Sequence, residues 1–230
     1  MRLWMVSALL VYLLLTFALP GLAQDSPQKD SSGSSSSRNK KSPKAAKDSS
    51  GLEDGIVSGG AYRNSSLGLT CKIPAGWVLR TEEMNSREEQ DQKPSPQGTK
   101  GNTEENTGRV LLATFSRPPE AKGDDVNASI VIAAEPVAAY PGLTEAVQYL
   151  DVVTEVPKAQ GFEADEDPYE LAIGPKTLVR ADLHKNVGSR VMHQSTMVFL
   201  AKGYAVSITV IGGTEDDVEG LVDGLSFSAK

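Results

Sequence analysis

The chain has 230 residues, with 23 basic and 30 acidic side chains and a net charge of −7. Its one cysteine excludes a disulfide framework and a multi-cysteine zinc site, and its two histidines exclude a histidine-rich metal site. Residues 56–230 are enough for one domain with its own core. They carry 16 basic and 25 acidic side chains, and this balance of −9 argues against nucleic acid as a partner.

The N-terminus has the organisation of a secretory signal over residues 1–23. Arg2 precedes an apolar run from Leu3 to Leu19, and Gly21-Leu22-Ala23 supplies small residues for cleavage. We expect cleavage between Ala23 and Gln24, which would make the mature protein extracytoplasmic, either periplasmic or secreted. An uncleaved anchor is the alternative, because the apolar run is at the short limit for crossing a bilayer.

Residues 24–55 are rich in Ser, Lys and Asp and contain one large apolar side chain, Leu52. Such a segment buries too little surface to offset its chain entropy, so we expect a disordered spacer whose deletion leaves the domain's stability unchanged. One interpretation of five basic residues within it is a contact with an anionic surface such as lipid headgroups. The alternative is a solubilising linker with balanced charge. These basic residues are Arg38, Lys40, Lys41, Lys44 and Lys47.

The first half of the domain is predicted to be mostly strands. Apolar and polar residues alternate over 67–73, which indicates a half-buried strand, and a turn at 74–76 leads into an extended segment at 77–79. Residues 81–108 contain one large apolar residue, Met84, and are predicted to be a disordered insertion, with a functional flap as the alternative. Apolar runs at 110–115 and 130–134 predict a hairpin.

The second half predicts two helices and four more strands. Leu143, Ala146, Val147, Leu150 and Val153 have helical spacing, and we expect Pro157 to end that helix. Strands are expected at 169–173, 177–183, 191–200 and 204–211, and a last helix is expected after an N-cap at Thr214. This order predicts an α+β fold, with a single antiparallel β-sheet flanked by helices.

Short motifs at both ends of the domain resemble those of PsbP-like domains. The motifs are Tyr62-Arg-Asn64, Leu67-Gly-Leu69 and Ile73-Pro-Ala-Gly-Trp77 at the start, with Ile173-Gly-Pro-Lys-Thr-Leu-Val-Arg180, Gly203-Tyr204 and Leu225-Ser-Phe227 at the end. The resemblance covers about 62–80 and 109–228. It implies an α/β/α sandwich that generally serves as a non-enzymatic binding or assembly module. The basic spacer and the 81–108 insertion depart from the family pattern.

Candidate chemistry is sparse. If Lys185 pairs with Arg190 in the predicted hairpin, Asp182 lies opposite His193, as an ion pair or as two metal ligands. Glu163, Asp165 and Asp167 alternate like the first ligands of a calcium loop, but Pro168 stands where that loop needs glycine.

Two further side chains, Cys71 and Trp77, are candidates for a functional role. Cys71 is expected to be a small buried hydrophobe on its strand rather than a nucleophile. Trp77 is expected to anchor the core beside the turn at 74–76. The alternative for Trp77 is a place at the edge of a binding groove, where it would contact a partner.

The sequence therefore favours a non-catalytic binding or accessory domain, without a catalytic, cofactor or metal site, whose partner is a protein or small ligand of the cell envelope. Two alternatives remain open. One is a carboxylate- or metal-dependent hydrolase that uses the region of Asp182 and His193. The other is a structural cell-envelope protein whose segment 38–47 rests on an anionic surface.

Overall fold

The computed structural model describes residues 51–91, 108–123 and 125–229. The predicted signal peptide, the spacer up to residue 50 with its basic residues 38–47, and residues 92–107 of the predicted insertion lie outside this range. The described residues have the predicted α+β composition, with three α-helices. Their strands form two antiparallel sheets where the sequence predicted one, so the single-sheet prediction is corrected.

The larger sheet has eight strands in the order β4-β5-β6-β11-β10-β9-β7, with β8 also paired to β9. Its long strands are the predicted ones, and consecutive strands pair antiparallel as the short turns require. The strands are β4 (Val78–Leu79), β5 (Arg109–Phe115), β6 (Ser129–Pro136), β7 (Glu163–Ala164), β8 (Tyr169–Ile173), β9 (Lys176–Val187), β10 (Arg190–Ala201) and β11 (Tyr204–Gly212).

The smaller sheet has four short strands in the order β1-β2-β3-β12. They are β1 (Ile56–Ser58), β2 (Ala61–Asn64), β3 (Leu69–Lys72) and β12 (Leu225–Phe227). The apolar face of β3 is buried as the alternation predicted, with Leu69 and Cys71 almost fully enclosed. The chain's last strand pairs with β3, Leu225 standing opposite Cys71. Strands of three or four residues carry too little periodicity to reveal this second sheet in the sequence.

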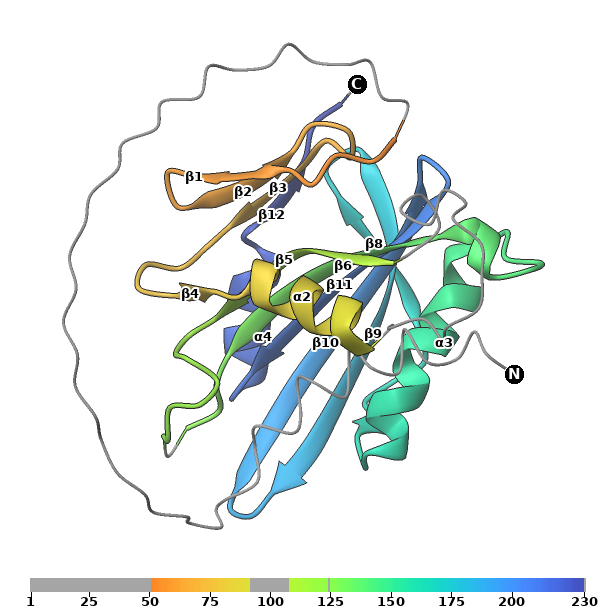
Figure 1. The fold of residues 1–230 in the computed structure, drawn as a ribbon. Coiled ribbons are helices and arrows are strands. Elements are labelled where there is room, and N and C mark those ends of the chain that lie inside the picture. The colour runs from red at the N-terminus through yellow and green to blue at the C-terminus, as the bar shows by residue number, and fades with distance from the viewer. Residues whose placement is uncertain (1–50, 92–107, 124, 230) are drawn as a thin grey trace, which may run out of the picture.

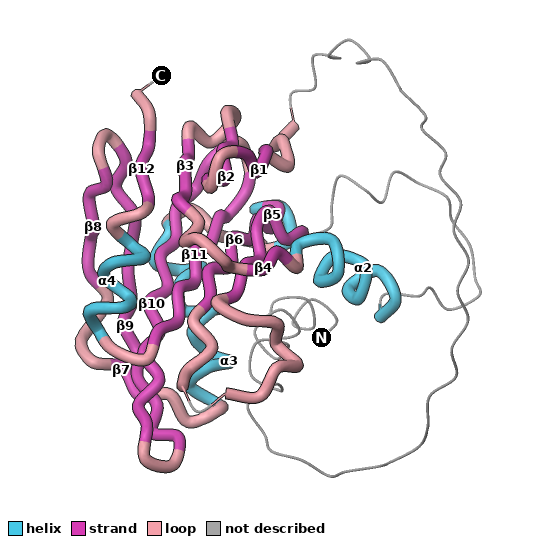
Figure 2. The backbone as a smooth tube through the Cα atoms, turned by 90° about the vertical axis from the view of Figure 1, so that its left-hand side faces the viewer, coloured by secondary structure: helices cyan, strands magenta, loops and turns pink. Residues whose placement is uncertain are grey.

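The two faces of the larger sheet are covered differently (Figure 1). One face packs against α2 and α3, in two clusters that include Met84 and Leu150. The other face packs against α4 and the smaller sheet, in a cluster that joins Phe199 to Val218 and Phe227. Figure 2 shows α2 and α4 on opposite sides of the larger sheet. The expected sandwich of helix, sheet and helix is therefore altered, because the smaller sheet shares one outer layer with α4.

The helices are α2 (Thr81–Asp91), α3 (Ala146–Ala159) and α4 (Glu215–Val222), and a 3₁₀ turn spans Val137–Ala139. Pro157 does not end α3, because its fixed φ is helical and the helix runs on for two more residues. The predicted cap of α4 is confirmed, since the Thr214 hydroxyl accepts a hydrogen bond of 3.0 Å from the Asp217 amide. Among the described residues no helix combines the length and hydrophobicity that crossing a bilayer requires.

Helix α2 corrects the prediction of disorder for the first part of residues 81–108. It is held to β5 by polar contacts that leave no trace in hydrophobic periodicity. The Asn85 amide both donates to the Val110 carbonyl, at 3.0 Å, and accepts from the Val110 N–H, at 2.9 Å. It thus acts as the strand neighbour that Val110 lacks on that side, because β4 pairs only with residues 114 and 115. Among the described side chains of α2, Met84 supplies the one buried apolar contact.

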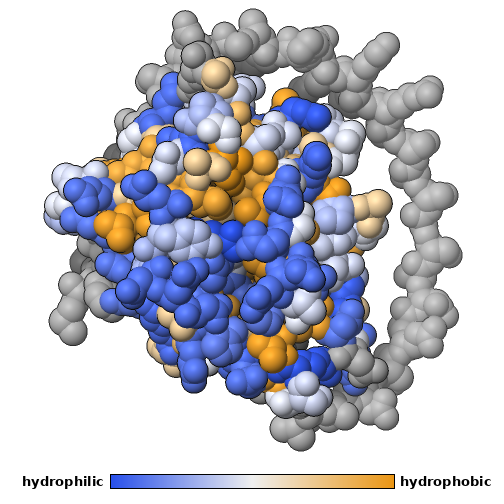
Figure 3. All heavy atoms as spheres, turned by 180° about the vertical axis from the view of Figure 1, so that it is seen from behind, coloured by the Kyte–Doolittle hydropathy of each residue, from blue (hydrophilic) through white to orange (hydrophobic). Residues whose placement is uncertain are grey.

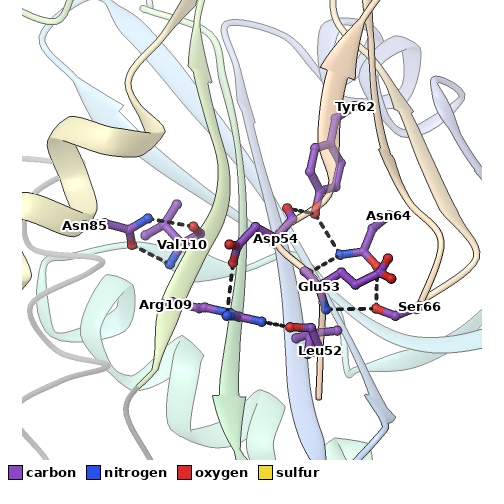
Figure 4. A network of polar contacts seen from close by, with 9 residues as sticks. All are labelled: Leu52, Glu53, Asp54, Tyr62, Asn64, Ser66, Asn85, Arg109 and Val110. Atoms are coloured by element: carbon purple, nitrogen blue, oxygen red, sulfur yellow. Dashed lines mark hydrogen bonds and ion pairs between the residues drawn. The ribbon is translucent and has the colours of Figure 1, made fainter. Parts of the chain in front are cut away.

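The end of the predicted spacer also belongs to the fold (Figure 4). Leu52 is 6% exposed and joins the core beneath the smaller sheet. Arg109 forms an ion pair of 3.0 Å with Asp54 and donates to the Leu52 carbonyl. The Asn64 amide donates to the Glu53 carbonyl at 2.7 Å, and the Tyr62 hydroxyl donates to the Asp54 carbonyl at 2.9 Å. The described domain therefore begins before residue 56, which corrects the expected boundary.

This attachment predicts different outcomes for two truncations. A chain that starts at Gly51 should unfold at the same denaturant concentration as the chain that starts at Gln24. A chain that starts at Ile56 loses the buried Leu52 side chain, which alone should cost about 2–5 kcal/mol. Chemical denaturation of both chains measures the difference.

Two point variants accompany the truncations, one that removes the buried side chain and one that is a control at an exposed leucine. Leu52→Ala should reproduce most of the loss, whereas Leu79→Ala, at a site that is 48% exposed, should cost less than about 1 kcal/mol. Equal stability of the two truncated chains would show that residues 51–55 do not contribute to the fold.

Candidate functional site

The hairpin of β9 and β10 has a different register from the one expected. Val187 pairs with Arg190, so the turn consists of Gly188 and Ser189 alone, with Gly188 at a φ of 64°. A two-residue turn with glycine first matches the twist of the strands. This register shifts the pairing by two residues, so His193 stands opposite His184 and Asp182 stands opposite Ser195. The expected pair of Asp182 and His193 is therefore corrected, because these residues are only diagonal neighbours.

Asp182 is occupied by a network on the α4 side of the sheet. The Arg180 guanidinium donates to Asp182 at 2.9 Å and contacts the Glu219 carboxylate of α4 through both terminal nitrogens. The Tyr169 hydroxyl of β8 donates to the other Asp182 oxygen at 2.7 Å. The Arg180 side chain is only 5% exposed. An aspartate with these partners is committed to structure and is not available as a base or a metal ligand.

The ionisation of this network follows from its contacts. Burial alone would lower the pKa of Arg180, but its hydrogen bonds to Glu219 and Asp182 outweigh that effect, and the net shift is upward. Burial and the hydrogen bond to Asp182 raise the pKa of the Tyr169 hydroxyl. The arginine therefore stays charged and the tyrosine stays neutral, as the hydrogen bonds require.

Three residues with metal-binding side chains form one row across β7, β9 and β10. Glu163 stands opposite His184, which stands opposite His193. Asp165 contacts the Nδ1 atom of His184 at 2.5 Å, and a Glu163 oxygen lies 4.0 Å from the Nε2 atom. Glu163 and Asp165 thus face His184 rather than a calcium loop. Within the described part of the chain, no three such side chains already converge on one point that could hold an ion.

An open groove of about 810 Å³ lies beside this row. It is bounded by the turn between β9 and β10, by the loop at 125–126 and by the start of α4. Its lining includes Arg190, His193 and four carboxylates, which are Asp125, Glu215, Asp216 and Asp217. Asp125 is already paired with Arg117 at 2.6 Å. The groove is therefore acidic, and its polar groups are spread over a wide mouth rather than directed at one atom.

Two candidate nucleophilic side chains, Cys71 and Ser195, are enclosed. Cys71 is fully buried, and burial raises its thiol pKa to about 12, so at neutral pH it is an uncharged part of the core, as expected. Ser195 is also fully buried, opposite Asp182. Neither is placed beside a base that a substrate could reach.

Trp77 packs against the core next to the smaller sheet and is half-buried. It does not line the acidic groove. Its position agrees with the expected core contact more closely than with a groove, although its ring is not enclosed. The other expected partner-contact residues, Arg38, Lys40, Lys41, Lys44 and Lys47, lie outside the described residues.

The sequence points to several residues of the row, but not to their arrangement and not to the groove. Both histidines and the acidic run at 163–167 were noted, yet only the hairpin register brings Glu163, His184 and His193 into one row. Asn186-Val187-Gly188-Ser189 contained the signal, since a glycine-first two-residue turn would have given the observed pairing. The ion pair of Arg180 with Glu219 joins residues 39 positions apart, and nothing in the local sequence indicates it.

The Arg180 network predicts unequal costs for its members. Arg180→Ala leaves the Asp182 and Glu219 carboxylates without their shared guanidinium partner and should lower the free energy of unfolding by about 3 kcal/mol or more. Glu219→Gln should cost less than about 1 kcal/mol, because the Glu219 side chain is 54% exposed. Arg190→Ala, at an exposed site, is the matched control and should cost under about 0.5 kcal/mol. Urea denaturation of the three variants measures this order, and equal losses would contradict it.

Comparisons with known proteins give a distant likeness of fold. No protein-family model matches the sequence, and no curated protein matches it. Cyanobacterial PsbP from Synechocystis is 16% identical, with a TM-score of 0.41 over 73% of this chain and 91% of that one. LpqN of Mycobacterium tuberculosis, described as involved in cell envelope biogenesis, is 11% identical, with a TM-score of 0.36 over 70% and 83%. The Ran-binding protein Mog1p of Saccharomyces cerevisiae is 14% identical, with a TM-score of 0.34 over 70% and 80%. The chain thus has a distant structural similarity to the Mog1/PsbP-like fold.

Proposed function

We propose that this protein is a non-catalytic binding or accessory domain that acts outside the cytoplasm, after cleavage between Ala23 and Gln24. The observation that carries the proposal is the placement of the acidic groove relative to the point where the N-terminal segment joins the domain. In Figure 1 the described chain begins at the upper end, beside the smaller sheet and the C-terminus. The turn of β9 and β10, which borders the groove, lies at the lower end in both Figures 1 and 2.

This arrangement suits a domain that is carried on a tether. If the basic residues 38–47 contact an anionic surface, residues 24–50 would hold the upper end near it, while the contacts of Leu52, Asp54 and Arg109 fix where this segment meets the domain. The groove would then face away from that surface and remain open to a partner. Hydrophilic residues cover most of the lower half of the rear face (Figure 3), which keeps that end exposed to water.

The charge of the groove supports a cationic partner. Four carboxylates and one arginine line it, a balance of −3, and Arg117 reduces this to −2 through its ion pair with Asp125. The N-terminus of α4 contributes only about half a positive charge. The groove therefore stays negative, and it favours a partner that presents positive charge, such as a basic segment of a protein or a polyamine.

The same charge bears on the alternative of an anionic surface. In the sequence, the basic run from Arg38 to Lys47 ends four residues before Gly51, where the described chain begins. If these residues touch an anionic surface, repulsion of the groove by that surface favours the orientation in which the groove points outward. Contact through 38–47 would then support binding at the groove rather than replace it. A hydrolase at Asp182 and His193 finds no support, because Asp182 is held by Arg180 and Tyr169.

A charge-neutralised groove tests the proposal. The chain 24–230 and its Glu215→Gln/Asp216→Asn variant are used to capture partners from the envelope fraction of the native host. Each exposed charge contributes about 0.5–1 kcal/mol, so the variant should bind its partner about five- to thirtyfold more weakly. An oligolysine peptide, followed by NMR, should perturb residues 189–193 and 213–217 in the unmodified chain only.

The matched control is Asp151→Asn/Glu155→Gln on α3, which removes the same charge at exposed positions away from the groove. This control should capture the partner as well as the unmodified chain does. Equal capture by the groove variant, or oligolysine contacts elsewhere, would show that the groove is not the binding surface.

A further inference from the structure

We propose that Glu163, His184 and His193 form a surface site for one divalent transition-metal ion of the zinc type. The chain has two histidines in all, and the hairpin register places them directly opposite each other. Side chains of directly paired residues point to the same face of a sheet. The register of β7 adds Glu163 to the same row, so three adjacent strands each contribute one donor.

His184 is already oriented as a metal ligand would be. Asp165 contacts its Nδ1 atom, which fixes the ring and directs the Nε2 lone pair away from Asp165. A carboxylate on the far nitrogen is the usual support of a metal-binding histidine, and it makes the other nitrogen more basic. Nε2 points toward Glu163, whose Oε2 atom is 4.0 Å away. Two donors that share a tetrahedral ion at about 2.0–2.2 Å each lie about 3.3–3.6 Å apart, so the exposed Glu163 carboxylate has to move slightly closer to His184.

His193 supplies the third donor after a small movement. Its ring centre is 6.5 Å from that of His184, at an interplanar angle of 37°. Two imidazoles that bind one zinc ion tetrahedrally have ring centres roughly 5–6 Å apart, so a modest rotation of His193 is enough. The Nδ1 atom of His193 is buried and has no hydrogen-bond partner among the described residues, so no contact there has to be broken.

The donor set favours a doubly charged transition-metal ion of borderline softness. Imidazole ligands select zinc, copper or nickel over magnesium and calcium, which prefer sets of oxygen ligands. Gly212 is the next residue in the row after His193, and a side chain at Gly212 would meet the Asp217 side chain. Asp217 thus stands over the end of the row and adds negative potential. The Glu163 side chain is 80% exposed, which leaves it free to turn toward an ion that enters from solvent.

Zinc titration of the chain 24–230 tests this site. Calorimetry should show saturable binding of one Zn²⁺ per chain, and magnesium at the same concentration should give none. Because both histidines belong to the proposed site, the ring signals of the whole protein report on it directly by NMR. Both rings should shift together and saturate at one equivalent.

Variants identify the donors. His184→Gln and His193→Gln should each weaken zinc binding at least about tenfold, and Glu163→Gln should weaken it several-fold. Glu170→Gln, an exposed carboxylate on β8, is the matched control and should bind zinc unchanged. Circular dichroism checks the folding of each variant, and the NMR titration of the unmodified chain decides the matter without any variant.

The proposal fails if the ring signals do not move with zinc in tenfold excess, or if binding survives both histidine substitutions. It does not rest on the proposed partner at the groove, although His193 also lines that groove. The Glu215→Gln/Asp216→Asn variant retains every proposed donor and should still bind zinc, so failure at one site is distinguishable from failure at the other.

Discussion

The buried guanidinium of Arg180 is the contact on which the positions of both candidate sites depend. A buried charge is costly unless it is paired and hydrogen-bonded, and here two carboxylates and the Tyr169 ring surround it. Because Glu219 belongs to α4 and Asp182 to β9, the network fixes the helix against one register of the strand. A slip of one residue would turn Arg180 toward α3 and leave Glu219 without it. The start of α4, and with it one wall of the groove, is thereby fixed beside the turn of β9 and β10.

The same register determines which chemistry the sheet displays. Residues 180, 182 and 184 alternate onto the α4 face of β9, and the two-residue turn aligns His193 with His184. The long strands could be predicted because their apolar residues alternate and their turns contain glycine. Their register could not be predicted with the same certainty, because Asn186-Val187-Gly188 allowed a longer turn. A register shift of two residues leaves each side chain on the same face of the sheet but changes every cross-strand partner. His193 therefore lies opposite His184 instead of Asp182.

Two segments that were predicted to be disordered are ordered, and the reason is the same in both. A prediction from composition depends on the number of apolar residues and does not detect side chains that hydrogen-bond to the backbone. Helix α2 has one large apolar side chain, yet Asn85 satisfies both backbone groups of Val110. Leu52 stands alone in a polar segment, yet Tyr62, Asn64 and Arg109 hold the backbone around it and allow it to reach the core. In both places a few side chains bonded to backbone order a segment that periodicity alone assigns to disorder.

The two proposed sites share His193, so their occupants should influence each other. An ion at the row would bring two positive charges beside a groove whose own charge, with the Arg117 pair included, is −2. A cationic partner would then meet a nearly neutral surface, and zinc should weaken its binding at low ionic strength. Linkage requires that the partner weaken zinc by the same factor. The sign of this coupling follows from Coulomb's law, and its size falls with added salt because the groove is open to solvent.

Measuring the partner's affinity with and without zinc, at two salt concentrations, determines the sign and the size of the coupling. Tighter partner binding in the presence of zinc would mean that the ion bridges the two molecules instead of screening one of them.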